Sequence, residues 1–169
     1  GAMVLVDEAH SMGFIGHHGR GVAEDQDCLA DVDFVISTFS KTFGGIGGIL
    51  LGDDDVVDYI QHSARSFTFS ASLPVPVVAA ASCILDMLQA DGPALVAELQ
   101  EKASYMRTQL IERGFDLGKS DTHIMPVMCR DLRKVLFMHT ALFESGVNMV
   151  PITYPGCREG EERLRLNVT

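Results

Sequence analysis

The sequence predicts an α/β fold, in which an α/β layer over residues 1–115 is followed by a smaller α+β unit over residues 116–169. Three observations lead to this prediction. Short apolar runs recur in the first part, as buried parallel strands do. Apolar residues at helical spacing follow them, and the second part alternates strand and helix patterns. With 47% hydrophobic residues, the chain of 169 residues has enough apolar material for a sizeable core.

The first part begins with strands and a glycine-rich loop. The apolar run at residues 3–6 ends at Asp7 and is typical of a buried parallel strand. Residues 8–22 are rich in glycine and histidine, which indicates a loop. Residues 33–38 and 44–51 are predicted to form a second and a third strand.

Helices follow these strands. Asp53 is placed to cap a short helix. Pro74 and Pro76 suit the first turn of an alanine-rich helix that reaches about Gln89. The remaining predicted elements are a helix from residues 91–93 to Gly114, a strand over 123–128, a helix over 131–145 that Gly146 ends, a strand over 147–150 and a last alternating strand over 164–169.

Composition excludes some classes of function. The chain has 13 Lys and Arg against 23 Asp and Glu, a net charge of −10, whereas nucleic-acid binding needs clustered basic residues. No apolar run approaches the ~20 residues of a membrane span. No secretory signal opens the chain. The four cysteines are scattered without a CxxC pair, which favours free thiols over a metal site or disulfides, so we expect a cytoplasmic protein.

Acidic residues and a histidine directly follow the first predicted strand. Ligands in open α/β sheets bind beyond the carboxyl ends of strands, so Asp7, Glu8 and His10 are candidate functional residues. Residues 4–10 also spell the DEAH form of a Walker B strand, in which the carboxylates serve Mg²⁺ and water. That alternative needs a GxxxxGKS or GxxxxGKT phosphate loop, which this sequence does not contain. A third alternative is an aspartate that only caps a turn.

Lys41 differs from the other three lysines of the chain. It follows the second predicted strand and is flanked by hydroxyl, aromatic and glycine residues, with no charge nearby in the sequence. Because desolvation disfavours the charged form, an amine in such surroundings tends to lose its proton and become a nucleophile toward an aldehyde. The alternative is a surface lysine in a flexible loop.

Four motifs together carry a resemblance to one family. They are DEAHS at residues 7–11 with the glycines that follow it, TFSK at 38–41, GG at 47–48 and FSASLP at 69–74. In this order and spacing the whole chain resembles the α-oxoamine synthases, which are fold-type I pyridoxal-phosphate enzymes, and it is most similar to serine palmitoyltransferase. The resemblance implies that residues 1–115 are the C-terminal half of the cofactor-binding large domain, with a mostly parallel sheet. It implies that residues 116–169 are a truncated, small C-terminal α+β domain.

The resemblance implies three catalytic residues. Lys41 corresponds to the lysine that forms the Schiff base with pyridoxal phosphate. Asp7 corresponds to the partner of the protonated pyridine nitrogen, which keeps the ring an electron sink. His10 corresponds to the residue that hydrogen-bonds the phenolic oxygen of the ring.

Three further residues are implied to bind cofactor or substrate. Thr38 corresponds to a residue that binds the cofactor phosphate. Ser70 corresponds to the hydroxyl that reaches the phosphate of the neighbouring subunit's cofactor, which implies a homodimer with a shared active site. Arg165 corresponds to the arginine that holds the substrate carboxylate, a task that suits a bidentate guanidinium; the alternative is a solvated strand arginine.

The activity that the resemblance implies is the condensation of an amino acid with an acyl-CoA, with loss of CO₂, to give an aminoketone. Serine is the favoured amino acid and the product is then of the 3-ketosphinganine type. One alternative is another α-oxoamine synthase, such as 8-amino-7-oxononanoate synthase or 2-amino-3-ketobutyrate CoA ligase. An alternative of a different class is a non-catalytic dimerising homologue or fragment. Family members extend further at both ends, so we expect the isolated chain to lack activity.

Overall fold

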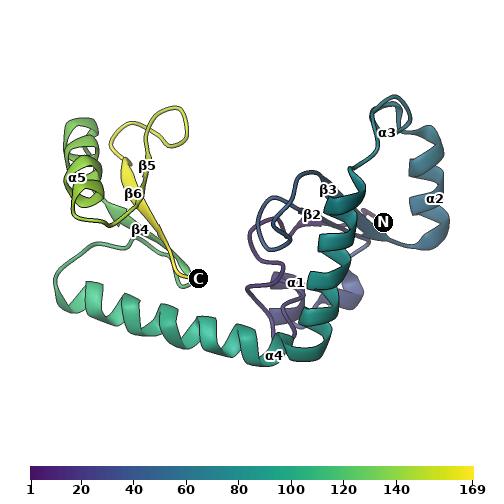
Figure 1. Ribbon diagram of the computed structural model, residues 1–169, viewed down its shortest axis with the longest axis horizontal. Helices are drawn as coiled ribbons and strands as arrows, with labels where there is room; N and C mark the ends of the chain where they lie inside the picture. The colour runs from purple at the N-terminus through teal and green to yellow at the C-terminus, as the bar shows by residue number, and fades with distance from the viewer. The chain divides into compact units, whose positions relative to one another are not determined.

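The computed structural model describes residues 1–169, and they form two compact units, Gly1–Ala97 and Glu98–Thr169. Each unit is described by itself (Figure 1). The boundary between the units lies inside one long helix, α4 (Val75–Glu112), rather than near residue 115. The reason is that the second half of α4 packs with the elements that follow it, so that Ala103 belongs to the same hydrophobic core as the later strands.

The first unit contains a three-stranded sheet. Its strands, in spatial order, are β1 (Leu5–Asp7), β2 (Phe34–Thr38) and β3 (Gly48–Gly52). β1 and β2 are parallel, with Asp7 opposite Ile36, whereas β2 and β3 are antiparallel, with Thr38 opposite Gly48. The prediction of a buried first strand was wrong for this chain, because β1 is an edge strand and Leu5 is 54% exposed.

The first unit also contains short helices. They are α1 (Val22–Asp25), a single 3₁₀ turn (Leu29–Asp31), α2 (Asp54–Ser63) and α3 (Arg65–Thr68). The predicted cap of α2 is confirmed, since the Asp53 carboxylate accepts a hydrogen bond from the N–H of Asp55 at 3.1 Å. A mostly apolar groove of about 610 Å³ is lined on one side by Val35 and Leu51 of the sheet and on the other by Val78 and Leu85 of α4.

The long helix α4 is continuous where two helices were predicted. Pro93 lies inside it, and the helix runs through the Asp91–Pro93 segment without a break. An interior proline removes one backbone hydrogen bond, and its ring crowds the carbonyl four residues earlier, which favours a kink; helical residues nevertheless continue on both sides of Pro93. A Cβ on Gly92 would lie 2.9 Å from the His18 carbonyl oxygen, so this glycine allows close packing rather than ending the helix. By length and composition α4 is the one helix suited to crossing a membrane, which alone is weak evidence because helices of soluble proteins pass the same test.

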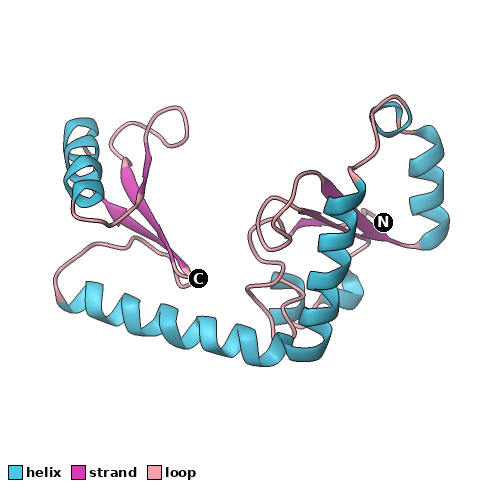
Figure 2. Cartoon of the chain, viewed as in Figure 1, coloured by secondary structure: helices cyan, strands magenta, loops and turns pink.

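The second unit is a three-stranded antiparallel sheet with α5 along it (Figure 2). Its elements are β4 (Ile124–Met128), α5 (Leu132–Glu144), β5 (Val150–Ile152) and β6 (Arg163–Asn167), and the strand order is β4-β6-β5. Met125, Val135 and Leu164 are completely buried between sheet and helix. The predicted strand over 147–150 begins late, because the N–H of Val147 still bonds the Leu142 carbonyl at the end of α5, at 2.8 Å.

Candidate functional site

Four of the predicted site residues lie on the loops that leave two adjacent strands. Asp7 ends β1 and His10 follows it, while Thr38 ends β2 and Lys41 follows three residues later. Because β1 and β2 are parallel, their carboxyl ends lie at the same edge of the sheet. The two loops therefore present a carboxylate, an imidazole, a hydroxyl and a primary amine at one edge.

A direct contact ties these two loops together. The hydroxyl of Thr42, next to Lys41, donates a hydrogen bond to the Met12 carbonyl oxygen at 2.5 Å. A Cβ on Gly13 would lie 2.2 Å from the Thr42 methyl group, and Gly13 has a φ of +85°, so only glycine fits here. Sequence reasoning did not single out Thr42. Its only signal was its position beside Lys41 and opposite a glycine-rich loop.

Thr38 lies in a network of hydroxyl groups at the end of β2. Its Oγ1 lies 2.8 Å from the Ser40 hydroxyl and donates to the Gly47 carbonyl at 3.2 Å, and it accepts from the N–H of Ser40 at 3.2 Å. The TFSK motif thus folds back on itself and places two hydroxyls before Lys41. Ser40 is a second hydroxyl that the sequence analysis did not assign.

Lys41 is exposed, so the desolvation that its neighbours predicted is wrong for this structure. The space beside Gly44 is open, since a Cβ there would meet nothing within 4 Å, whereas a Cβ on Gly45 or Gly47 would collide with Val77 or Leu73. Asp7 and His10 are also exposed, and the Asp7 carboxylate accepts a hydrogen bond from the N–H of Ala9 at 2.8 Å. The reactive side chains thus face an open surface on which a flat ligand has room.

Ser70 and Arg165 lie elsewhere in the chain. Ser70 follows α3, is exposed, and donates a hydrogen bond to the Ser66 carbonyl at 2.5 Å within its own turn. Arg165 belongs to the second unit, on the central strand β6, where it lies opposite Pro126 of β4 and Val150 of β5. The structure therefore brings four of the six predicted residues to one sheet edge and leaves these two in their own segments.

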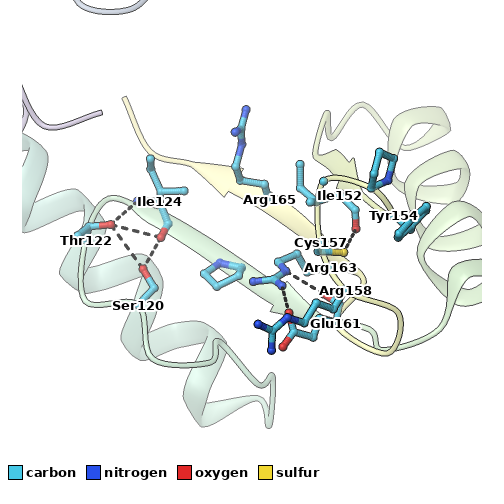
Figure 3. A pocket seen from close by; sticks show the side chains of 13 residues that line it. Ser120, Thr122, Ile124, Ile152, Tyr154, Cys157, Arg158, Glu161, Arg163 and Arg165 are labelled. Carbon is cyan, nitrogen blue, oxygen red and sulfur yellow. Dashed lines mark hydrogen bonds and ion pairs between the residues drawn. The ribbon is translucent and has the colours of Figure 1, made fainter. Parts of the chain in front are cut away.

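Arg165 lines a groove of about 760 Å³ in the second unit (Figure 3). Its Nε is buried and has no hydrogen-bond partner. At another part of the groove, Arg163 pairs with the Glu161 carboxylate at 3.4 Å, so the one acidic side chain of the lining is already engaged. A buried donor left without an acceptor costs about 1–3 kcal/mol, and an anionic group bound in this groove would remove that cost.

Glu24 stabilises the glycine-rich loop that follows β1. Its carboxylate accepts hydrogen bonds from the His18 ring at 2.7 Å and from the backbone N–H groups of His18 and Arg20 at 3.0 and 3.1 Å. Burial raises the pKa of Glu24, but these hydrogen bonds together outweigh burial and hold the pKa below its ordinary value. The stabilisation is therefore complete above pH 4.5 and is lost as the pH falls through the lower folded-state pKa.

Replacement of Glu24 by glutamine is expected to lower the free energy of unfolding by about 1 kcal/mol at pH 7, because the charged acceptor is lost. The difference between variant and parent should shrink as the pH falls below 4.5. Denaturant titrations at pH 7 and pH 3 measure it. Asp25→Asn is the matched control, since Asp25 bonds only the neighbouring Gln26 side chain. A Glu24→Gln difference that is the same at both pH values would contradict the assignment.

Comparison with known proteins identifies the family. The family model described as aminotransferase class I and II matches residues 1–169, so this chain belongs to that family. Serine palmitoyltransferase of Bacteriovorax stolpii is 41% identical over 165 residues, which are 98% of this chain and 39% of that protein. The 8-amino-7-oxononanoate synthase of Petrotoga mobilis is 36% identical over 169 residues, 99% of this chain and 42% of that protein. The relatives are thus α-oxoamine synthases, and the chain spans about two fifths of their length.

A solved structure gives the same result for the fold. It is described as SPT with a PLP internal aldimine, shares 35% of its residues with this chain and has a TM-score of 0.86, over 99% of this chain and 42% of that one. The prediction of a fold-type I pyridoxal-phosphate enzyme fold is confirmed. The site residues fit that cofactor, because an amine, a carboxylate and two hydroxyls meet on an open surface beside glycines. They are the groups that an aldehyde, a pyridine nitrogen and a phosphate require.

Proposed function

We propose that this chain is the cofactor-binding part of a pyridoxal-phosphate-dependent acyltransferase, which condenses an amino acid with an acyl-CoA and releases CO₂ and CoA. The observation that carries the proposal is the pair of loops at the carboxyl ends of β1 and β2, joined by the Thr42–Met12 hydrogen bond. The parallel pairing of β1 and β2 brings Asp7 and the loop that carries Lys41 to one edge of the sheet, and this contact joins the two loops there. Family membership supports the same class of chemistry.

Each residue of the site has a role that follows from its chemistry. When bound, pyridoxal phosphate supplies an electron sink for the α-carbon of the amino acid. The Asp7 carboxylate holds a proton on the pyridine nitrogen by charge. The Lys41 amine would attach the cofactor, and its Nζ would take the α-proton of the amino acid. The Thr38 and Ser40 hydroxyls donate to the phosphate, and His10 donates to the ring oxygen.

Arg165 is proposed to bind the substrate carboxylate. Its buried, unpartnered Nε and its guanidinium offer the parallel donors that a carboxylate accepts. Ser70 is proposed to serve the cofactor phosphate of a second copy, because its exposed hydroxyl bonds only within its own turn here. The active protein is on this proposal a homodimer, which we place in the cytoplasm on account of its free cysteines.

Serine and a long-chain acyl-CoA are the proposed substrates. Their support is the 41% identity to a serine palmitoyltransferase and the likeness of the DEAHS and TFSK motifs. The 8-amino-7-oxononanoate synthase relative, at 36% identity, makes alanine with a dicarboxylic acyl thioester the competing pair. The two pairs differ in the side chain of the amino acid and in the charge at the far end of the acyl chain.

A substrate panel on the full-length protein tests this proposal. Serine, alanine and glycine are each combined with palmitoyl-CoA, pimeloyl-CoA and acetyl-CoA, and CoA release is followed with a thiol reagent. The expected result is the highest kcat/KM for serine with palmitoyl-CoA. If kcat/KM is instead highest for alanine with pimeloyl-CoA, the result would assign the oxononanoate synthase function. No CoA release from any pair, in protein that binds the cofactor, would favour a non-catalytic homologue.

A further inference from the structure

We propose that Glu8, which no part of the proposed reaction uses, is the positioning residue that holds Asp7 and His10 in place for the cofactor. This inference rests on the proposed function. Glu8 lies between those two residues in the DEAHS motif, yet it points the opposite way. Glu8 is 0% exposed, whereas Asp7 and His10 are both exposed.

The backbone of Glu8 joins the β1 loop to β2. Its N–H donates to the Ile36 carbonyl of β2 at 2.8 Å. Its carbonyl oxygen accepts from the N–H groups of Ser11 and Met12 at 3.1 and 2.9 Å, and from the Ser37 hydroxyl at 3.3 Å. The bonds to Ser11 and Met12 close a turn around His10. The chain from Asp7 to Met12 is therefore fixed against the strand that leads to Lys41.

The side chain of Glu8 anchors the other end of the glycine-rich loop. Its two carboxylate oxygens accept hydrogen bonds from the N–H groups of Val22 and Ala23 at 2.8 and 2.9 Å, and from the Ser11 hydroxyl. A Cβ on Gly21 would lie 2.3–2.7 Å from the carboxyl group, so the loop end closes directly over it. One buried carboxylate thus ties together the turn that carries His10 and the first residues of α1.

A second contact connects this turn to the loop that carries Lys41. Gly13 is the first glycine of the glycine-rich loop, and the carbonyl oxygen of Met12 before it accepts the Thr42 hydrogen bond next to Lys41. If Glu8 no longer held the turn, Asp7, His10 and the Met12 carbonyl would all shift relative to Lys41. Glu8 therefore acts through its neighbours rather than by touching a ligand, and its burial also leaves it no access to the Mg²⁺ that a Walker B role would require.

The test compares Glu8→Gln with a matched control, Glu162→Gln, in the full-length holoenzyme. Glutamine keeps the shape of the side chain but turns an NH₂ group toward backbone N–H donors, so at least one hydrogen bond is lost. Glu162 is likewise buried, at 6% exposed, and accepts backbone hydrogen bonds from Gly160 at 3.1 and 3.2 Å, but it belongs to the second unit. Both variants are expected to melt at a lower temperature than the parent.

Of these two variants, only Glu8→Gln is expected to change the absorbance of the bound cofactor. The absorbance band of bound pyridoxal phosphate, titrated against pH, reports the groups around its ring. We expect its midpoint to shift by about half a pH unit or more in Glu8→Gln, with kcat lowered ~10-fold or more because the reacting groups are misplaced. The midpoint should be unchanged in Glu162→Gln. Ser11→Ala, which removes one donor to the same carboxylate, should shift the midpoint in the same direction by less.

Three outcomes would overturn the inference. One is a Glu8→Gln protein that melts earlier but keeps the parent's midpoint and kcat, because Glu8 would then serve stability alone. If Glu8→Gln does not fold, Ser11→Ala replaces it in the test, and an unchanged midpoint and kcat in Ser11→Ala would overturn the inference. A parent protein that shows no band with pyridoxal phosphate would overturn the proposed function, and this inference with it. A shifted midpoint of the band in Glu8→Gln, together with a normal band in the parent protein, supports the inference.

Discussion

Substitution of Lys41 by alanine in the full-length protein is expected to lower turnover by ~10³-fold or more, equivalent to about 4 kcal/mol of transition-state stabilisation. Lys41 is the only lysine of the first unit and follows β2 at the sheet edge where β1 and β2 end, so it is the amine that we expect to take the α-proton. The cofactor should still bind through the hydroxyls and Asp7, but more weakly and without a covalent link. Borohydride reduction followed by peptide mapping measures that link directly.

Lys102→Ala is the matched control for this substitution. Lys102 lies on the exposed surface of α4 and pairs with Glu98 at 2.8 Å, so its loss should leave turnover and reductive labelling unchanged. In the parent protein the label is expected on Lys41 alone. A pyridoxyl label on any of the other lysines, which are Lys102, Lys119 and Lys134, would contradict the assignment.

Asp7→Asn is expected to retain the cofactor but to lower kcat ~100-fold or more, which is about 2.7 kcal/mol. The neutral amide no longer stabilises a proton on the pyridine nitrogen, so the α-carbanion loses its electron sink. Binding depends less on Asp7, because Lys41 and the hydroxyls remain. Equilibrium dialysis with pyridoxal phosphate and steady-state kinetics separate the two effects.

Asp33→Asn provides the comparison for Asp7→Asn. Asp33 accepts a hydrogen bond from the N–H of Val4 at 2.7 Å, at the opposite end of the same pair of strands. Its replacement should affect the stability of the β1–β2 pair and leave kcat near that of the parent. An Asp7→Asn protein that turns over within about threefold of the parent, well under 1 kcal/mol, would exclude Asp7 as the partner of the ring nitrogen.

Much of the site is predictable from the sequence because of the parallel pairing of β1 and β2. Two short apolar runs, each followed by polar residues, are enough to bring Asp7 and Lys41 to one edge of a sheet. The resemblance to the α-oxoamine synthases then adds the expected roles of Thr38 and His10. Capping is local chemistry as well, which is why Asp53 begins α2 as predicted; Asp131 caps α5 in the same way, although the sequence analysis did not name it.

The remaining features depend on contacts between residues far apart in the sequence. Glycine and proline at positions 92 and 93 normally indicate a break, but α4 runs through both, and the backbone at Gly92 packs closely against the His18 carbonyl oxygen. The role of Glu8 requires knowing that Val22 and Ala23 lie over it, 14 and 15 residues away. The exposure of Lys41 cannot be judged from its apolar neighbours, since Phe39 and Phe43 pack edge to face against each other and are themselves buried.

The strand order of the second unit has a consequence for how the protein is made. β6 is the last strand of the unit in the sequence but the middle strand of its sheet, and it carries the buried Leu164 and the groove-lining Arg165. During synthesis β4 and β5 leave the ribosome first and have no partner strand until β6 emerges between them. The β4–β6 half of the sheet therefore closes late, through pairs some 40 residues apart along the chain (Met125 with Leu166).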